Sequence, residues 1–257
     1  MLGLDIVKQL DLSSKLTLDS LIVYEQLNST QTSLAHAAPS IGHSWRAIIA
    51  QQQTAGEGRH GRIWQSTLGQ VALSWRGWVS IPAESIGLIS LAVALAIADA
   101  LTLFGIKNVQ FKWPNDIYIQ DKKLAGVLVT ICYKKENKFD LVLGIGLNRL
   151  HSSLPEQAIA LADIIPHPPA LSAVLAELLM AWHQWKVVLM SEEGRNRVCI
   201  AWLERALWVN ASVRVLLQTA YIDGVFVGIT SNGLLRVATE DGEKIFAAGD
   251  VQLRPLE

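Results

Sequence analysis

Residues 53–64 are the part of this chain whose conformation the sequence restricts most. Positions 56–62 contain three glycines and two arginines, which are Gly56, Gly58, Gly61, Arg59 and Arg62. Glycine loses the most conformational freedom on ordering, so this run disfavours both a helix and a strand. We predict a loop whose backbone can approach a ligand closely, with guanidinium groups available to an anion. A solvated surface loop is the alternative for a motif this short.

A second unusual segment is Lys112-Trp113-Pro114-Asn115-Asp116, which follows the strand-like residues 109–111. It places an amide and a carboxylate directly after a turn that proline stiffens. Simple structural roles are open for its polar residues and for the nearby Lys123. Asp116 could cap the turn, Lys112 could be its solvated partner, and Lys123 could be the polar residue of a hairpin turn.

The composition limits the class of protein. A chain of 257 residues permits one large domain, or a medium domain and a small one. Its hydrophobic content of 51% and charged content of 18% allow a substantial core. The net charge of −1 provides no overall positive field for nucleic acid or an anionic membrane. Phosphate binding would therefore require local charge, such as that at 56–62.

The cysteines and apolar segments exclude several other classes. Cys132 and Cys199 are too few for a disulfide scaffold and fit no zinc spacing, so we expect no fixed metal site and a cytoplasmic location. Cys132 lies in an apolar run and is read as a small buried hydrophobe. The N-terminus lacks a secretory pattern. Residues 86–104 are apolar but include Asp99 and lack basic flanks, which favours a buried helix over a membrane span.

The hydrophobic pattern predicts an α+β fold. Strands are expected at 21–24, 46–52, 70–79, 109–113, 117–120, 124–133 and 139–147. Helices are expected at 29–38, 85–104, 170–190 and 192–206, and residues 151–169 are rich in proline and loop. Strands dominate the middle of the chain, which indicates a central mixed or mostly antiparallel sheet with flanking helices.

The pattern changes near Trp208. Short strands are expected at 212–217, 220–229, 234–239 and 244–247, with turns at Asp223-Gly224, Asn232-Gly233 and Asp241-Gly242. Turns about ten residues apart are typical of a small β-barrel. We therefore predict two domains, 1–207 and 208–257.

Taken together, these motifs resemble the biotin–protein ligases. Gly-x-Gly-Arg-x-Gly-Arg at 56–62 precedes Lys-Trp-Pro-Asn-Asp at 112–116 and Lys-Leu-Ala-Gly at 123–126. Ser29-Thr30 and Gly-Ile-Gly-Leu-Asn at 144–148 match two further motifs of the family. The resemblance extends over nearly the whole chain. It implies the class II synthetase-like catalytic fold of biotin and lipoate ligases, followed by an SH3-like barrel.

The resemblance also implies a two-step reaction that uses biotin, ATP and Mg²⁺. Biotin's carboxylate attacks ATP to give biotinyl-5′-AMP and pyrophosphate. A specific lysine of a biotin carboxyl carrier protein, part of a biotin-dependent carboxylase, then takes the biotinyl group. The first step brings like charges together, at a cost of about 4 kcal/mol for two unit charges about 4 Å apart at an effective dielectric near 20. Fixed cations and Mg²⁺ must offset that repulsion.

The matching positions acquire roles by the same resemblance. The implied catalytic residues are Lys123, Arg59 and Asp116. The implied biotin-binding residues are Ser29, Thr30, Gln31, Gln53, Glu57, Gly58, Arg59 and Lys123. The implied ATP or adenylate residues are Gly56, Arg59, Arg62, Trp64, Lys112, Asn115 and Asn148. Ser29 and Thr30 could instead cap the following helix, and both roles are compatible.

The chain departs from the family pattern at two positions. Glu57 replaces a basic residue between the first two glycines, and an added anion should weaken anion binding unless its side chain points away. Gln31 stands where asparagine is common in the family, which keeps the amide on a longer side chain.

Three other functions fit the sequence less well. Lipoate–protein ligases and octanoyltransferases favour Arg-Arg-x-x-Gly-Gly-Gly or Arg-Gly-Gly loops, and neither string occurs. DNA-binding repressors of the family carry a winged helix-turn-helix of about 60 residues. Only 28 residues precede Ser29, so we expect a single-function ligase without specific DNA binding. A non-catalytic binding module would not need the three motifs. Either a monomer or a homodimer is compatible with the sequence.

Overall fold

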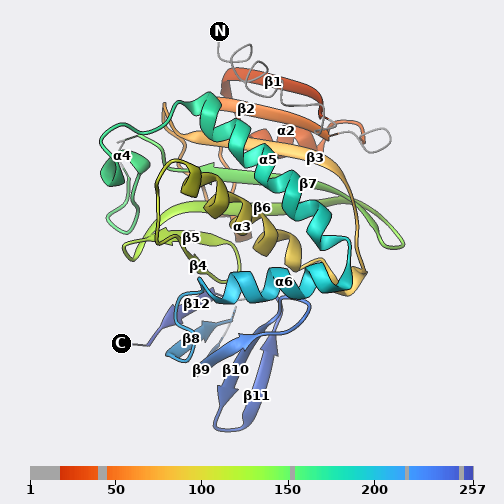
Figure 1. Ribbon diagram of the computed structural model, residues 1–257, viewed down its shortest axis with the longest axis vertical. Helices are drawn as coiled ribbons and strands as arrows, with labels where there is room; N and C mark the ends of the chain where they lie inside the picture. Colours follow the sequence, from red (N-terminus) through yellow and green to blue (C-terminus); the bar gives the residue numbers. More distant parts are fainter. Residues whose placement is uncertain (1–17, 40–44, 151–153, 218–219, 249–251, 257) are drawn as a thin grey trace.

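The computed structural model describes residues 18–39, 45–150, 154–217, 220–248 and 252–256. Its main sheet has seven strands in the order β1-β2-β3-β7-β6-β5-β4 (Figure 1). The strands are β1 (Leu18–Leu27), β2 (Trp45–Gln53), β3 (Val71–Ser80), β4 (Gln110–Lys112), β5 (Asp116–Ile119), β6 (Lys122–Lys135) and β7 (Lys138–Leu147). β1 and β2 pair in parallel, whereas the other neighbours are antiparallel. The predicted mixed sheet is confirmed.

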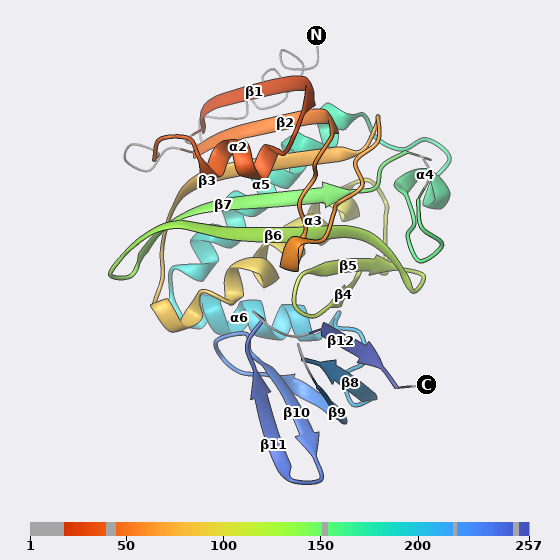
Figure 2. The same ribbon diagram turned by 180° about the vertical axis from the view of Figure 1, so that it is seen from behind.

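Helices cover the two faces of this sheet unequally. The long helices α3 (Leu88–Leu103), α5 (Leu171–Leu189) and α6 (Glu192–Leu203) lie on one side (Figure 1). The short helix α2 (Thr30–Ala35) and the glycine-rich loop lie on the other side (Figure 2). Three shorter helical turns are α4 (Leu161–Ile164), η2 (Arg59–Gly61) and η3 (Ala83–Ser85).

Helix α3 explains the apolar run at 86–104. It packs against α5, α6 and β6, and its side chains are buried on nearly every side. A helix that is apolar all round is expected in the core of such a protein. Within the described ranges, no helix has both the length and the apolar character needed to cross a membrane.

The C-terminal part forms a second, five-stranded antiparallel sheet in the order β11-β10-β9-β8-β12. Its strands are β8 (Ser212–Leu216), β9 (Tyr221–Ile229), β10 (Leu235–Thr239), β11 (Gly242–Phe246) and β12 (Gln252–Pro255). The predicted turns at Asn232-Gly233 and Asp241-Gly242 are confirmed, with φ of 79° at Gly233 and 108° at Gly242. Strand β12 and helix α4 were not predicted from the sequence.

The turn predicted at Asp223-Gly224 is wrong. Both residues lie inside β9, where Asp223 pairs with Arg214 and Gly224 pairs with Val213. A Cβ added to Gly224 would lie 2.4 Å from the carbonyl oxygen of Ala238 on β10. Glycine therefore serves the close approach of two strands here, and not a turn.

The segment that carries Asp116 is held between the two sheets. Phe111 stacks on Trp202 of α6 with ring centroids 5.9 Å apart, and its backbone exchanges hydrogen bonds of 2.8 Å with Arg205 and Leu207. The indole Nε1 of Trp113 donates to the carbonyl oxygen of Gly233 at 3.1 Å. Both sheets contribute to one hydrophobic cluster. Residues 112–116 thus have a rigid base.

Candidate active site

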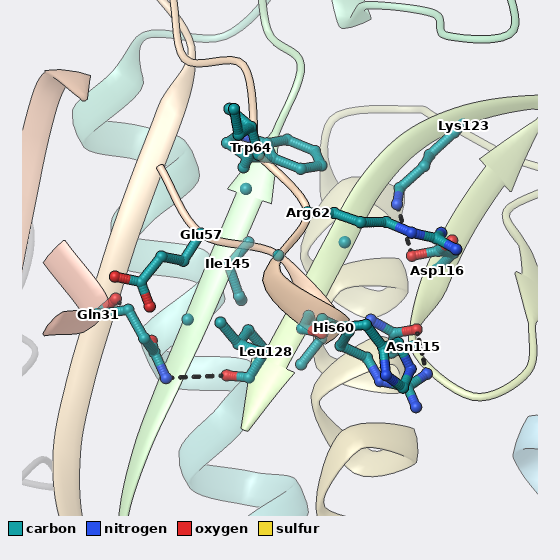
Figure 3. A pocket seen from close by; sticks show the side chains of 18 of the residues that line it. Gln31, Glu57, His60, Arg62, Trp64, Asn115, Asp116, Lys123, Leu128 and Ile145 are labelled. Carbon is teal, nitrogen blue, oxygen red and sulfur yellow. Dashed lines mark hydrogen bonds and ion pairs between the residues drawn. The ribbon is translucent and has the colours of Figure 1, made fainter. Parts of the chain in front are cut away.

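A pocket opens on the face of the main sheet that carries α2 and the glycine-rich loop (Figure 3). The predicted site residues that line it are Ser29, Thr30, Gln31, Gln53, Glu57, Gly58, Arg59, Arg62, Trp64, Lys112, Asn115, Asp116 and Lys123. Gly56 and Asn148 do not line it. The fold thus brings together side chains from four separate stretches of sequence.

The end of the pocket at α2 is lined by uncharged polar side chains, to which Glu57 of the glycine-rich loop adds one carboxylate. Ser29 caps α2 by accepting a hydrogen bond from the backbone N–H of Thr32, as the sequence suggested. Thr30 lies beside it, with its Oγ1 2.8 Å from Ser74 Oγ. The backbone N–H of Thr30 donates to Gln53 Oε1 at 2.8 Å. Neighbouring protein groups therefore set the orientation of these hydrogen-bonding side chains.

Gln31 is fixed in the same way. Its Nε2 donates to Thr130 Oγ1 at 2.8 Å and to the carbonyl oxygen of Val142 at 3.1 Å. Its Oε1 accepts a hydrogen bond of 3.1 Å from Ser74 Oγ. The longer side chain of glutamine reaches across the sheet to β6 and β7, so Gln31 serves the framework of the pocket as well as its lining.

Two glycines of β7 make room for this arrangement. A Cβ added to Gly144 would lie 2.4 Å from Gln31 Oε1, and one added to Gly146 would lie 2.2 Å from the ring of Trp64. Glycine in a strand interior often marks such a close approach. The Gly-x-Gly motif of 144–146 therefore accommodates two other pocket residues.

The glycine-rich loop forms a compact turn over the pocket. Its base is closed by hydrogen bonds from Gly58 N to Arg62 O at 2.7 Å and from Trp64 N to Gly56 O at 2.8 Å. A Cβ added to Gly56 would lie 2.4 Å from the carbonyl oxygen of Trp64, which explains a glycine there. The tip reaches the second motif, because Arg59 Nη1 donates to Asn115 Oδ1 at 3.3 Å.

Glu57 points away from the cations of the pocket. Thr32 Oγ1 on α2 donates a hydrogen bond to Glu57 Oε1. Figure 3 shows Glu57 beside Gln31 at one end of the pocket, whereas Lys123 and Asp116 lie at the other. Glu57 therefore stays in the pocket lining but lies at the opposite end from Lys123, where its charge opposes anion binding less than it would beside the cations.

The other end of the pocket is cationic. Lys123 Nζ forms an ion pair of 2.7 Å with Asp116 Oδ1 and lies 5.5 Å from the centroid of the Trp64 ring. Lys112 Nζ lies 5.3 Å from the ring of Trp208 and 5.7 Å from that of Tyr118. Asp116 thus forms an ion pair with Lys123. The sequence had offered Lys112 as a possible partner of this carboxylate.

Burial shifts the pKa values of several groups at this end of the pocket. Desolvation lowers the pKa of Lys112 and of Arg59, and in both cases the negative charge of Asp116 acts in the opposite direction. Desolvation also raises the pKa of Tyr118 to about 12, so its hydroxyl stays protonated at neutral pH. Partly desolvated cations gain more from a bound anion than solvated ones do.

Asn148 acts from behind the pocket. It is buried, and its Nδ2 donates to the carbonyl oxygen of Lys123 at 3.3 Å. The backbone N–H of Lys123 donates to Gln157 O at 2.8 Å. These contacts hold the start of β6, so Asn148 positions the backbone of Lys123.

Sequence reasoning missed several lining residues, namely His60, Ile63, Leu73, Ser74, Val127, Leu128, Ile145 and Leu253. Most lie in strands of the two sheets, and only the pairing of those strands shows that they border the pocket. Leu253 comes from β12 of the C-terminal sheet, so both parts of the chain border the pocket. Among the described residues, no group of three or more His, Cys, Asp or Glu side chains could hold a metal ion.

Comparisons with known proteins agree with this geometry. Residues 23–148 match the model of the biotin/lipoate A/B protein ligase family, and residues 210–254 match the biotin protein ligase C-terminal domain. A biotin–[acetyl-CoA-carboxylase] ligase of Mycobacterium tuberculosis is 30% identical over 242 residues, which are 89% of this chain and 87% of that protein. The chain belongs to the biotin protein ligases.

Other relatives extend the comparison. This ligase is 31% identical to the bifunctional ligase/repressor BirA of Escherichia coli over 217 residues. These residues are 82% of this chain and 67% of BirA. Its fold is similar to that of the biotin protein ligase from Aquifex aeolicus in complex with biotin and ATP. That comparison has a TM-score of 0.78 and 28% identity, and it covers 93% of this chain and 100% of that one. The predicted family and fold class are confirmed.

Proposed function

We propose that this ligase converts biotin and ATP into biotinyl-5′-AMP and pyrophosphate, and then biotinylates a lysine of a biotin carboxyl carrier protein. The observation that carries the proposal is one pocket with a polar end at α2, whose side chains are uncharged apart from Glu57, and a cationic end at Lys112 and Lys123. The names of relatives support the substrates, because one solved relative holds biotin and ATP and another acts on acetyl-CoA carboxylase.

Biotin is assigned to the polar end at α2. Its uncharged ureido ring needs donors and acceptors. Ser29, Thr30, Gln31 and Gln53 are polar side chains that line this end, and their bonds to protein groups fix their orientations. A site that commits buried polar groups to a ligand discriminates strongly against analogues that lack the partners. Biotin's carboxylate would extend past Glu57 and Gly58 toward Lys123.

ATP is assigned to the cationic end. Arg59, Arg62 and Lys112 can contact phosphate oxygens, and the ring of Trp64 and the amide of Asn115 border the space proposed for adenine. Lys123 Nζ lies where one charge can serve both the carboxylate and the α-phosphate, once these anions compete with Asp116 for it. Such a preorganised charge stabilises the transition state more than a solvated one.

Mg²⁺ would arrive with ATP. It usually keeps its waters and binds phosphate oxygens with one or two carboxylates. Asp116 is the carboxylate at the phosphate end of the pocket, so the donor set fits a metal carried by the nucleotide. Bound there, the metal would neutralise phosphate charge.

In the second step the carrier's lysine nitrogen attacks the carbonyl carbon of the mixed anhydride. An amide bond forms, the bond to the phosphate oxygen breaks, and AMP leaves. The amine must lose a proton, and Asp116 would accept that proton or orient the amine. Closure of the glycine-rich loop would exclude water that could hydrolyse the anhydride.

The proposal includes three further points. The chain divides into a catalytic domain of 1–207 and a C-terminal domain of 208–257, supported by the two separate sheets. The ligase acts in the cytoplasm, consistent with its two free thiols, Cys132 and Cys199. It acts without sequence-specific DNA binding, consistent with a net charge of −1.

The direct test is exchange of labelled pyrophosphate into ATP. We expect exchange that requires biotin and Mg²⁺, with lipoate as the control substrate. Absence of exchange with biotin, or equal exchange with lipoate, would refute the assignment.

A further inference from the structure

A buried ion pair lies beneath α2, at a place where the proposed reaction needs no charge. Arg76 on β3 is 3% exposed and Asp140 on β7 is 0% exposed. Arg76 Nε lies 3.1 Å from both carboxylate oxygens of Asp140, and Nη2 lies 2.6 Å from Oδ2. Removing such a pair from water is costly, so its retention suggests a geometric role.

The remaining guanidinium nitrogen binds the end of α2. Arg76 Nη1 donates to the carbonyl oxygens of Leu34 at 2.7 Å, Ala35 at 3.1 Å and Ala37 at 2.5 Å. The last turn of a helix leaves carbonyl groups without partners, and a cation there is also favoured by the helix dipole. One side chain therefore caps the carboxyl end of this helix.

Helix α2 depends on such contacts because it has only six residues. Isolated helices shorter than about 12 residues are marginal in water. At its amino end, Thr30 is held by Gln53 and by Ser74 of β3. Ser74 and Arg76 are two residues apart on one strand face, about 7 Å. That spacing approximates the rise of four helical residues, about 6 Å. One face of β3 thus holds both ends of α2.

We propose that Arg76 is a positioning residue for biotin binding, which holds α2 against β3 so that Ser29, Thr30 and Gln31 face the pocket. This inference rests on the proposed function, in which those residues contact biotin. Asp140 fixes the direction of the guanidinium group. Its hydrogen bond is also the main reason that the pKa of Arg76 is raised, so the cap remains charged.

Arg46 provides a matched control. It is the register partner of Arg76 on the neighbouring strand β2. Its Nη2 donates to the carbonyl oxygen of Ala38, beyond the end of α2. Arg46→Met therefore removes a guanidinium group next to Arg76 and leaves the contacts of Arg76 with the helix end in place.

Two variants test the role of Arg76. Arg76→Met combined with Asp140→Leu removes both charges together, so that neither is left buried alone. Arg76→Lys keeps a charge for Asp140, but a single ammonium cannot reproduce the planar set of donors that reaches both Asp140 and the helix. Pyrophosphate exchange gives kcat and the KM values for biotin and ATP, and amide hydrogen exchange reports the order of residues 30–35.

We expect the double variant to raise KM for biotin by about 10-fold or more, since displacing a positioning element by about 1 Å can have such an effect. KM for ATP and kcat should stay within about twofold, the pattern of lost binding that is equal in the ground state and the transition state. Amide exchange in α2 should accelerate. Arg76→Lys should shift the same quantities in the same direction, and Arg46→Met should shift none of them.

An unchanged KM for biotin in the folded double variant, or an equal loss for both substrates and in kcat, would overturn the role. If the double variant does not fold, the same criteria apply to Arg76→Lys. Lack of biotin-dependent exchange in the unmodified ligase would count against the proposed function instead, and amide exchange in α2 would still report whether Arg76 holds the helix.

Discussion

Lys123 combines a surface position with a central place in the pocket. Its ion pair with Asp116 is partly solvated, and such pairs contribute little to stability. Lys123→Ala should therefore change the folding midpoint little. It should lower adenylate formation by about 10²-fold, the scale for removing one preorganised charge stabiliser. Pyrophosphate exchange and thermal melts measure the two effects. Lys122→Ala, one residue away and exposed, is the control. Near-normal exchange with reduced stability would indicate a purely structural lysine.

Lys112 should give the activity an alkaline limit below the usual range of lysine. Its pKa is lowered, mainly by desolvation, so it loses its proton at a lower pH than a solvated lysine. The alkaline fall of kcat/KM for ATP reports the free enzyme. Lys112→Arg should move this fall to higher pH, and Lys122→Arg should not. An unchanged profile for Lys112→Arg would remove Lys112 from phosphate binding.

The lowered pKa of Lys112 affects stability in the opposite direction to activity: activity falls with rising pH, whereas this group's contribution to stability increases. Between the lowered pKa of Lys112 and the ordinary value of 10.5, the unfolded chain binds more protons than the folded one. The contribution of this group to the free energy of unfolding therefore increases with pH across that window.

Glu57 places an anion in a pocket that we propose binds anions, while its carboxylate accepts a hydrogen bond from Thr32. Glu57→Arg should slow release of biotinyl-adenylate by roughly threefold, which corresponds to a partly solvated charge interaction. Glu57→Gln keeps an acceptor for Thr32 and isolates the charge. Release rates follow from a chase with unlabelled biotin and ATP. Faster release in the arginine variant would show that the contact with Thr32 matters more than the charge.

At the scale of elements, the glycine-rich loop is the segment expected to change most on ligand binding. Three glycines disfavour any single conformation of the empty loop, and the ligand would supply anion contacts to Arg59 and Arg62. Biotin with ATP should therefore reduce tryptic cleavage at these arginines. Cleavage at the exposed lysines of the β6–β7 turn, Lys135 and Lys138, is the internal control. Equal protection at both places would indicate general stabilisation and not a closing loop.

The elements also show which features a single sequence can reveal. The two motif segments and the long helices were predictable, because glycine content, proline position and apolar periodicity act locally. Asp223-Gly224 has the composition of a turn, yet lies inside β9 because a neighbouring strand passes close to Gly224. Local composition cannot distinguish these two uses of glycine.

Contacts between residues far apart in the sequence could not be predicted for a different reason. Arg76 and Asp140 are 64 residues apart, and they meet only through the pairing of β3 with β7. The lining residue Leu253 depends likewise on the position of β12. Such contacts follow from strand order, which hydrophobic periodicity does not encode.

For the whole molecule, the charge balance predicts weak interaction with DNA. The chain carries a net charge of −1, and residues 1–20 also sum to −1, from Lys8 and Lys15 against Asp5, Asp11 and Asp19. Of that leading segment, residues 1–17 lie outside the described part. Phosphate contacts dominate DNA affinity, so binding at physiological salt should be weak even with biotin and ATP present. A sharp, biotin-dependent mobility shift with operator DNA, resistant to competitor DNA, would contradict this expectation.

The hydrogen bond from Trp113 to Gly233 has a consequence for how such ligases can diverge. It joins the second motif of the pocket to a hairpin turn of the C-terminal sheet, inside a hydrophobic cluster that both sheets share. A chimaera that took its last 50 or so residues from a distant relative would keep the tryptophan but replace the loop that receives it. The catalytic part and the C-terminal sheet should therefore be inherited together. Recombination between lineages should succeed only where Trp113 and the turn at Gly233 come from the same parent.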